Sequence, residues 1–161
     1  MPDRRPVDID LRRPFTRAAA LRAGVNPRAL RGPNFRTIFR GVYIHSSVPP
    51  HPFHRIAAAL LIHPSGAVIS HLSGARLYAL PVPYGAEEHV TVFAEADRRR
   101  RPEIRNHIAP SGREVAQVGG VRVSAPHDLF IELAGILGLV DLVVAGDALV
   151  RKHRTTPQDL Q

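Results

Sequence analysis

The sequence predicts an α+β protein in which a small N-terminal module precedes a larger mixed α/β core. Helix-capping and hairpin signals follow one another closely within residues 14–46, after an extended arm over residues 1–13. A linker with three prolines spans residues 46–52, and helical and strand patterns alternate within residues 53–155. With 161 residues, 44% of them hydrophobic, the chain is long enough for a substantial core beside a smaller module.

Two short helices and a β-hairpin are expected in the N-terminal module. Thr16 is a residue type that caps helices, and Gly24 is positioned to end the helix that follows Thr16. The Asn26-Pro27 pair predicts a second short helix, because proline presets the backbone of a first helical turn. Aromatic and β-branched residues then predict a hairpin over residues 35–44. Helix, turn, helix and hairpin in this order are the layout of a winged helix-turn-helix.

The core region is expected to contain further helices and strands. Pro81 and Gly138 are positioned to end helices, and the Gly119-Gly120 pair predicts a tight hairpin. Two strand-like segments are expected to be partners on either side of a hairpin loop over residues 94–102. The expected strands are 67–69, 89–93, 104–108, 115–118 and 121–124, and the expected helices are 54–62, 70–79, 126–137 and 139–152.

The positive charge of the chain is concentrated near its N-terminus. The formal net charge is +8, from 22 basic and 14 acidic residues. Residues 1–40 contain ten arginines and three aspartates, a net charge of +7, whereas residues 41–161 have a net charge of only +1. Such a local cationic surface attracts polyanions such as nucleic acid or an acidic membrane. Arginine also suits phosphates and guanine edges, because its planar guanidinium donates two parallel hydrogen bonds.

The candidate DNA contacts lie mainly on the second helix and the hairpin of the N-terminal module. Arg28 and Arg31 are three residues apart, so they share one face of their helix. In a helix-turn-helix the second helix enters the major groove, and a basic residue at the hairpin tip reaches a phosphate or the minor groove. The alternative is a solvated basic face without a ligand. The candidate DNA-binding residues are Arg17, Arg22, Asn26, Arg28, Arg31, Arg36 and Arg40.

Three stretches of the sequence resemble the AbiEi-type antitoxin family of type IV toxin–antitoxin systems. The first is FTRAAALRAGVNPRALRGPNFRTIFRGVY at residues 15–43. The second is SHLSGARLYALP at residues 70–81, followed by HVTV at residues 89–92. The third is VRVSAPHDLFIELAGILGLVDLVVAGDALVRK at residues 121–152. Together they cover roughly residues 14–155 and look most like the actinobacterial branch, in which such a region often precedes a Vsr-like endonuclease domain that is absent here.

The resemblance implies a winged-helix DNA-binding module followed by an α/β antitoxin-like core. Family members of the antitoxin type repress their own operon and counter a nucleotidyltransferase-like toxin. Matched to this sequence, the recognition helix corresponds to residues 26–31 and the wing to residues 36–43. The partners implied are therefore double-stranded DNA and a nucleotidyltransferase-like toxin.

The sequence lacks the nuclease motif and two other common enzyme motifs, so we expect no enzymatic activity. Vsr-like nucleases resemble one another in a Glu-x-Lys motif, but Lys152 is the only lysine and Val150 stands two positions before it. There is no phosphate-binding GxxxxGK[ST] loop and no GxSxG nucleophile motif. Asp128 and Glu132 are one helical turn apart, where the helix dipole favours carboxylates, and we expect them to have that structural role.

Neither a metal site nor a cofactor is expected. His45, His51 and His54 are close in sequence, but they lie across a proline-rich linker without a helical i, i+4 pair. The chain has no cysteine and therefore no cysteine-ligated zinc site. The run Arg98–Arg101 stands among acidic residues, which favours a solvated loop over a second nucleic-acid contact.

The cytoplasm is the expected compartment. The first residues contain no apolar segment of the kind that secretory signals have. The most apolar stretch, residues 129–150, includes three carboxylates, which argues against a membrane span.

We therefore expect a DNA-binding, antitoxin-like transcriptional regulator. Two alternatives stay open: a protein-interaction module that neutralises a nucleotidyltransferase-like toxin, and the non-catalytic N-terminal half of a truncated Vsr-like endonuclease. The sequence leaves the oligomeric state, the operator and the toxin open.

Overall fold

The computed structural model describes residues 8–153, which form a mixed α and β structure with five α-helices and two β-sheets. The described residues divide into two compact units, with the boundary between Ile62 and His63. We call these unit 1 and unit 2 and describe each by itself. The expected α+β class is confirmed in this form.

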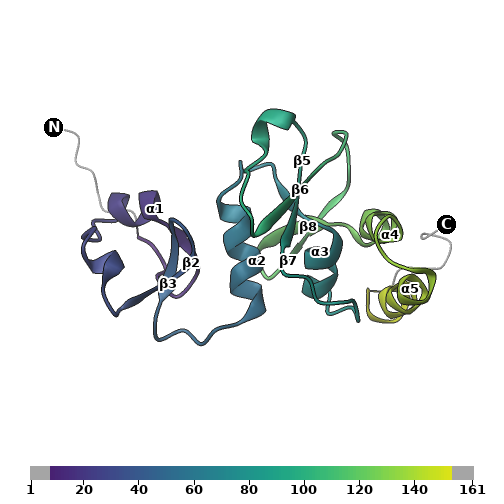
Figure 1. The fold of residues 1–161 in the computed structure, drawn as a ribbon, viewed down its shortest axis with the longest axis horizontal. Helices are drawn as coiled ribbons and strands as arrows, with labels where there is room; N and C mark the ends of the chain where they lie inside the picture. The colour runs from purple at the N-terminus through teal and green to yellow at the C-terminus, as the bar shows by residue number, and fades with distance from the viewer. Residues whose placement is uncertain (1–7, 154–161) are drawn as a thin grey trace. The chain divides into compact units, whose positions relative to one another are not determined.

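Unit 1 is built around a three-stranded antiparallel sheet in the order β1-β3-β2 (Figure 1). A short α-helix and one turn of 3-10 helix stand between the first two strands of the chain, and a longer helix ends the unit. Its elements are β1 (Phe15–Thr16), α1 (Arg17–Arg22), the 3-10 helix η1 (Ala29–Arg31), β2 (Phe35–Phe39), β3 (Val42–His45) and α2 (Pro52–Leu61).

The predicted capping of α1 is confirmed. The Thr16 hydroxyl accepts a hydrogen bond from the backbone N–H of Ala19 at 3.1 Å, and the alanine-rich segment that follows favours a helix. Gly24 follows the helix with φ +83°, a conformation that glycine adopts without strain. The second predicted helix, at residues 27–31, is present only as η1, which is a single 3-10 turn.

The two faces of this sheet have different partners. The hairpin turns at Gly41, with φ +84°, after a bulge between Thr37 and Phe39. Phe35 and Tyr43 lie on one face of the sheet. The Phe35 ring meets the Phe15 ring edge to face, and the Tyr43 ring stacks on the Phe15 ring. This aromatic cluster, with Leu30 of η1, forms a small hydrophobic core on this face of the sheet. On the opposite face α2 packs against strands of the sheet.

The helix α2 begins two residues before the predicted start. His51 caps it by accepting the backbone N–H of Phe53 at its Nδ1, at 3.1 Å, and Pro52 is the first helical residue. The Arg55 guanidinium lies over the Phe39 ring, 4.9 Å from its centroid, which joins the helix to β2. The division between the units therefore follows α2, beyond the proline-rich linker at residues 46–52.

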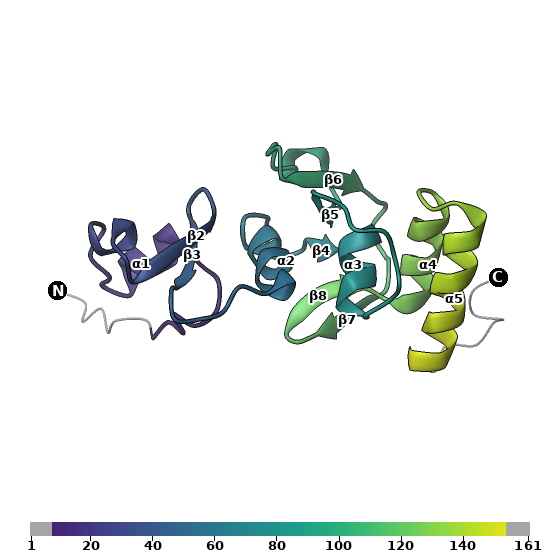
Figure 2. The same cartoon turned by 60° about the horizontal axis from the view of Figure 1, so that its bottom comes forward.

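Unit 2 contains a five-stranded mixed sheet in the order β6-β5-β4-β8-β7 (Figure 2). α3 and α4 pack against strands of this sheet and against each other, and α5 packs against α4. The elements are β4 (Val68–Ile69), α3 (His71–Leu77), β5 (Glu88–Val92), the 3-10 helix η2 (Glu95–Asp97), β6 (Ile104–Ile108), β7 (Val115–Val118), β8 (Val121–Ser124), α4 (Pro126–Ala134) and α5 (Leu139–His153).

The direction of β6 differs from the prediction. β5 and β6 pair in parallel, so the segment between them is a crossover that contains η2, and the run Arg98–Arg101 does not form the predicted hairpin loop. The alternation of apolar residues identifies both strands, but it has no information about their relative direction. The hairpin of β7 and β8 is confirmed, and Gly119 and Gly120 adopt the positive φ values that its tight turn requires.

Close approach between α3, α4 and the sheet depends on Gly74. A Cβ atom at this position would lie 2.9 Å from Leu129 Cδ1 and 3.4 Å from Val123 Cγ2. The end of α3 is further tied to α5, because Lys152 donates from Nζ to the carbonyl of Ala79 at 2.5 Å. Within residues 8–153, none of the helices has both the length and the apolar character needed to cross a lipid bilayer.

Tyr78, at the end of α3, gives this packing a testable dependence on pH. Its hydroxyl donates to the carbonyl of Ser124 at 3.1 Å, and burial raises the pKa of Tyr78 to about 12. Because the folded pKa exceeds the unfolded value of 10, the stabilisation is complete below pH 10 and is lost as the pH rises toward 12. We expect a loss of roughly 1 kcal/mol at pH 11, measured by urea unfolding.

Tyr78→Phe should remove this alkaline decline and cost about 1 kcal/mol at neutral pH, because the Ser124 carbonyl loses its donor. Tyr84→Phe is the matched control, since the side chain of Tyr84 is largely exposed. An alkaline decline that persists unchanged in Tyr78→Phe would contradict the assignment.

Candidate functional site

The structure places six of the seven candidate DNA-binding residues at exposed positions of unit 1. The seventh is only partly exposed. The six exposed residues are Arg17, Arg22, Asn26, Arg28, Arg31 and Arg40, and the seventh is Arg36.

Arg28 stands directly before η1 in a helical backbone conformation, and Arg31 is the last residue of η1. Residues three apart eclipse one another in a 3-10 helix, so these two side chains leave the backbone in similar directions. Leu30, between them in sequence, is buried in the core of unit 1 and anchors the turn. Asn26 accepts the backbone N–H of Arg28 at its Oδ1, at 2.9 Å, so its side chain helps to form the turn.

A backbone hydrogen bond brings Arg17 close to the hairpin tip, where Arg40 lies. The N–H of Arg17 donates to the carbonyl of Gly41 at 2.9 Å, which ties the first residue of α1 to the tip of the hairpin. Arg22 stands in the last turn of α1, where a cation interacts favourably with the helix dipole. The strand β2 runs from the segment after η1 to the hairpin tip. Arg28 and Arg31 therefore precede one end of β2, and Arg40 follows the other end.

Arg36 does not join this set. It pairs with Ile44 in the sheet register, on the face opposite Tyr43, and it donates from Nη2 to the carbonyl of Val48 at 3.2 Å. Burial is the largest cause that lowers the pKa of His54, and the nearby charge of Arg36 adds to it, so Arg36 faces the α2 side of the sheet. Its guanidinium has a structural partner there.

Carboxylates are scarce around the arginines of unit 1. The sequence contains no aspartate or glutamate between Asp10 and Glu87. Residues 8–62 therefore contain nine arginines and only two aspartates, a net charge of +7. The positive charge of this unit cannot be neutralised by its own side chains, and it is available to an external polyanion.

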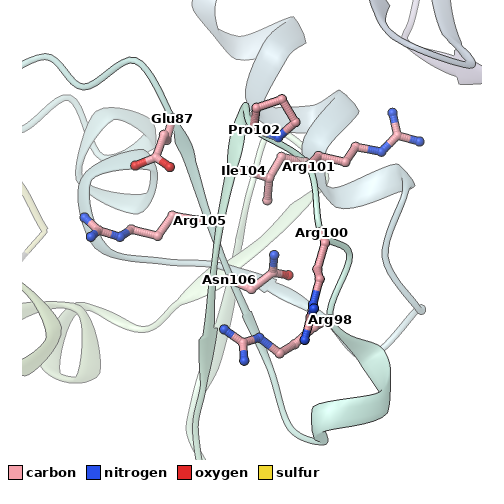
Figure 3. A pocket seen from close by; sticks show the side chains of 8 residues that line it. All are labelled: Glu87, Arg98, Arg100, Arg101, Pro102, Ile104, Arg105 and Asn106. Atoms are coloured by element: carbon pink, nitrogen blue, oxygen red, sulfur yellow. The ribbon is translucent and has the colours of Figure 1, made fainter.

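A second cluster of arginines, in unit 2, has carboxylates close to it. Four arginines, at positions 98, 100, 101 and 105, line a surface cavity of about 550 Å³ in unit 2 together with Glu87. Figure 3 shows that Arg105 extends to the side of Glu87, whereas Arg101 extends to the opposite side. Arg98 is paired with Glu95 at 2.9 Å. The guanidinium groups of this cluster do not converge on one point.

A group of three histidines in unit 2 was not predicted from the sequence. It consists of His71, His89 and His107. One ring nitrogen from each residue lies within 4.8 Å of the other two. The rings of His71 and His107 are stacked, with centroids 3.5 Å apart, and those of His89 and His107 are 5.1 Å apart. His89 Nδ1 and His107 Nε2 are 3.0 Å apart, a hydrogen-bond distance. We call these residues the three-histidine group.

The sheet register explains how residues so distant in sequence meet. β5 and β6 pair with His89 opposite Arg105 and with Thr91 opposite His107. Alternate residues of a strand point to the same face, so both histidines and Thr91 share one face of the sheet. His71 begins α3 directly after β4, and the N–H of Ser70 donates to the carbonyl of His89 at 3.2 Å.

His71 is held in an unusual backbone conformation by Glu132 of α4. It has φ +48°, which side-chain-bearing residues seldom adopt, and its N–H donates to Glu132 Oε2 at 3.1 Å. On the side chain, His71 Nδ1 lies 2.9 Å from the Ser70 hydroxyl, which accepts from Thr91 at 2.8 Å. Ser70 is the N-cap residue of α3, but its side chain makes no capping hydrogen bond.

Glu132 is buried and accepts hydrogen bonds from several elements of unit 2. Besides His71, it accepts from the Ser124 hydroxyl at 3.0 Å and from Arg113 at 3.2 Å. Burial raises the pKa of Glu132, while these hydrogen bonds oppose the increase. The neighbouring Asp128 accepts the backbone N–H of Glu114 at 2.9 Å. Both carboxylates therefore connect α4 to the sheet region, a role broader than the predicted dipole interaction.

The three-histidine group is electrically neutral at pH 7. Burial lowers the pKa of His71 to about 3, and the neighbouring His107 and His89 lower it further. Burial also lowers the pKa of His89 and of His107 to about 4, with Arg105 contributing in both cases. Neutral imidazole has a nitrogen lone pair that can accept a hydrogen bond or bind a metal ion.

A cavity of about 490 Å³ lies beside this group. His71 and His107 form part of its wall, together with Glu132 and two arginines, Arg98 and Arg113. A small molecule in this cavity would meet imidazole, guanidinium and carboxylate groups at once.

The histidines considered in the sequence have other contacts. His45 Nδ1 lies 2.7 Å from the Ser47 hydroxyl, His51 caps α2, and the His51 and His54 rings meet edge to face at 6.0 Å. Among the residues that the structure describes, the three-histidine group is the one set of three or more such side chains within metal-binding distance. Its members come from three elements, and sequence spacing alone gave no signal for it.

One apolar surface in unit 2 is exposed. Leu139, Val140 and Val143 on α5 are each at least 60% exposed, and Val144 is 44% exposed. Their spacing places them along one side of the helix.

No model of a known protein family matches the chain, and no curated protein matches it either.

Glu132 gives the clearest test of the polar network. Glu132→Ala leaves the His71 N–H and the Ser124 hydroxyl without their acceptor, and we expect a loss of about 3 kcal/mol in the free energy of unfolding. Glu132→Gln retains one acceptor oxygen and should fall between the wild type and the alanine variant. Urea unfolding at pH 7 measures both.

Asp141→Asn is the control, because Asp141 is exposed on α5, and it should change stability by less than about 0.5 kcal/mol. Equal stability of the wild type and Glu132→Ala would show that the network does not stabilise unit 2.

Proposed function

We propose that unit 1 binds double-stranded DNA through the exposed arginines of α1, η1 and the hairpin. The observation that supports this most strongly is the excess of exposed guanidinium groups in a segment without carboxylates between Asp10 and Glu87. Neutralising DNA phosphates with arginine releases condensed counterions, which favours binding. The biological role that accompanies this proposal is antitoxin-like transcriptional regulation in a type IV toxin–antitoxin system, as the family resemblance implies.

In this proposal unit 1 acts as a reduced winged helix. α1, η1 and the β2–β3 hairpin follow one another in the order that a winged helix-turn-helix requires. η1 is only three residues long, so it cannot extend along the major groove as a full recognition helix does. Phosphate contacts should therefore dominate the affinity, and base contacts from Arg28 and Arg31 should add a modest sequence preference.

The salt dependence of binding tests the electrostatic part of this proposal. If Arg17, Arg22, Arg28 and Arg31 each neutralise a phosphate, the logarithm of affinity should fall with the logarithm of salt concentration with a slope of about −3.6. Raising the salt from about 50 to 200 mM should then weaken binding about 100-fold. Fluorescence anisotropy with a labelled duplex measures both quantities.

A pair of double variants tests the location of the site. Arg28→Ala/Arg31→Ala should weaken binding at least about 10-fold and make the salt slope shallower by about 2. Arg98→Ala/Arg100→Ala removes the same charge from unit 2 and should change affinity by less than about twofold. Equal losses in the two variants would indicate nonspecific attraction to net charge and would overturn the assignment.

One observation favours the alternative function of a protein-interaction module. The exposed apolar side of α5, formed by Leu139, Val140, Val143 and Val144, is typical of surfaces that contact other proteins. Under this alternative the intact chain shows no duplex binding at low salt, and a nucleotidyltransferase-like toxin is recovered with it instead. The same anisotropy measurement therefore separates the two functions.

A further inference from the structure

The three-histidine group has the composition of a transition-metal site. Three imidazole side chains from α3, β5 and β6 place their nitrogens within 4.8 Å of one another. Imidazole suits Zn²⁺, Co²⁺, Ni²⁺ and Cu²⁺, and it is far less suited to Mg²⁺ or Ca²⁺, which prefer oxygen ligands. The carboxylate of Glu132 is also close, with its Oε2 3.8 Å from His71 Nδ1.

The contacts of His71 leave one of its nitrogens for a metal. The His71 Nδ1 atom lies 2.9 Å from the Ser70 hydroxyl and 3.8 Å from Glu132 Oε2. The other ring nitrogen, Nε2, takes no part in these contacts with Ser70 and Glu132. Metal-binding histidines commonly use the second nitrogen in this way, as a donor to a hydroxyl, carbonyl or carboxylate that fixes the ring. The same carboxylate fixes the His71 backbone, so the position of this ring is set from both sides.

The distance between the facing nitrogens of His89 and His107 is close to the one that a tetrahedral metal requires. Zn–N bonds of about 2.0–2.1 Å separate neighbouring ligand nitrogens by about 3.3 Å. His89 Nδ1 and His107 Nε2 are 3.0 Å apart, so a small outward rotation of these rings admits the ion. The stacked rings of His71 and His107, at 3.5 Å, must also turn out of parallel, because each lone pair lies in the plane of its ring.

The strain in His71 is a second and independent observation. A residue with a side chain at φ +48° costs free energy, and such strain concentrates at binding sites, where the surrounding structure fixes it. Here the strain is fixed by the hydrogen bond from His71 to the buried Glu132. The result is a histidine whose ring stacks on that of His107 and lies 5.6 Å, centroid to centroid, from that of His89.

We propose that His71, His89 and His107 bind one divalent transition-metal ion, with zinc as the probe, and leave its fourth coordination position open to the adjacent cavity. Three protein ligands with one open position are typical of zinc sites that hold a water molecule or an anion. The cavity wall includes Arg98 and Arg113, whose guanidinium groups favour an anion beside the metal.

The test uses the intact chain, dialysed against a chelator and then titrated with zinc chloride in a calorimeter. We expect one zinc site per chain. Cobalt chloride should give the intense visible absorption of a four-coordinate cobalt ion. His107→Gln removes one ligand from a partly exposed position and should weaken zinc binding at least about 100-fold, whereas second-layer changes cost about 10- to 100-fold.

His127→Gln is the matched control, because His127 is exposed on α4 and lies outside the group, and it should bind zinc like the wild type. A measurement on the wild type alone keeps the test valid even if a variant fails to fold. The imidazole ¹⁵N resonances of the three-histidine group should shift when zinc is added to the wild type. Zinc binding that leaves those resonances unchanged, undiminished affinity in a folded His107→Gln variant, or no heat of zinc binding would each overturn the proposal.

Discussion

The distribution of carboxylates along the chain constrains both units. No aspartate or glutamate occurs between Asp10 and Glu87, a stretch that includes nearly all of unit 1 and the whole of α3. In unit 1 the consequence is a cationic surface that its own side chains leave unneutralised. In unit 2 the consequence is that α3 takes its carboxylate partners from distant elements, Glu88 on β5 and Glu132 on α4. The same constraint thus produces an open charge in one unit and a buried polar network in the other.

The buried network explains why unit 2 tolerates so many polar groups in its interior. Glu88 accepts from the Ser73 hydroxyl at 2.5 Å and from Arg76, while Ser73 accepts the backbone N–H of His89 at 2.8 Å. Glu132 fixes the other end of α3 through His71. These hydrogen bonds satisfy most of the buried polar atoms and fix the helix relative to the strands, although Nε and Nη1 of Arg76 are buried without a hydrogen-bond partner among the described residues. Both carboxylates are linked to the backbone of the three-histidine group, Glu132 directly to the His71 N–H and Glu88 through Ser73 to the His89 N–H.

Local features of the fold were predictable, because they depend on residues close together in sequence. The cap at Thr16, the turn at Gly119-Gly120 and the helix start at Pro126 follow from backbone preferences and short-range hydrogen bonds. The parallel pairing of β5 with β6 was not predictable, since a strand pattern contains no direction. The three-histidine group depends on that pairing and on the turn at His71, so sequence spacing gave no indication of it. Exposure of the unit 1 arginines was expected, whereas the inward contact of Arg36 required the sheet register.

The central functional claim is that DNA contacts unit 1 and leaves unit 2 aside. Amide ¹H–¹⁵N spectra of the intact chain, recorded during titration with a short duplex, test this most directly. We expect shifts at α1, η1 and the hairpin tip, including the amides of Arg17, Arg28 and Arg31, with little change at residues 98–105. Shifts concentrated at residues 98–105, or an unchanged spectrum at a saturating amount of duplex, would contradict it.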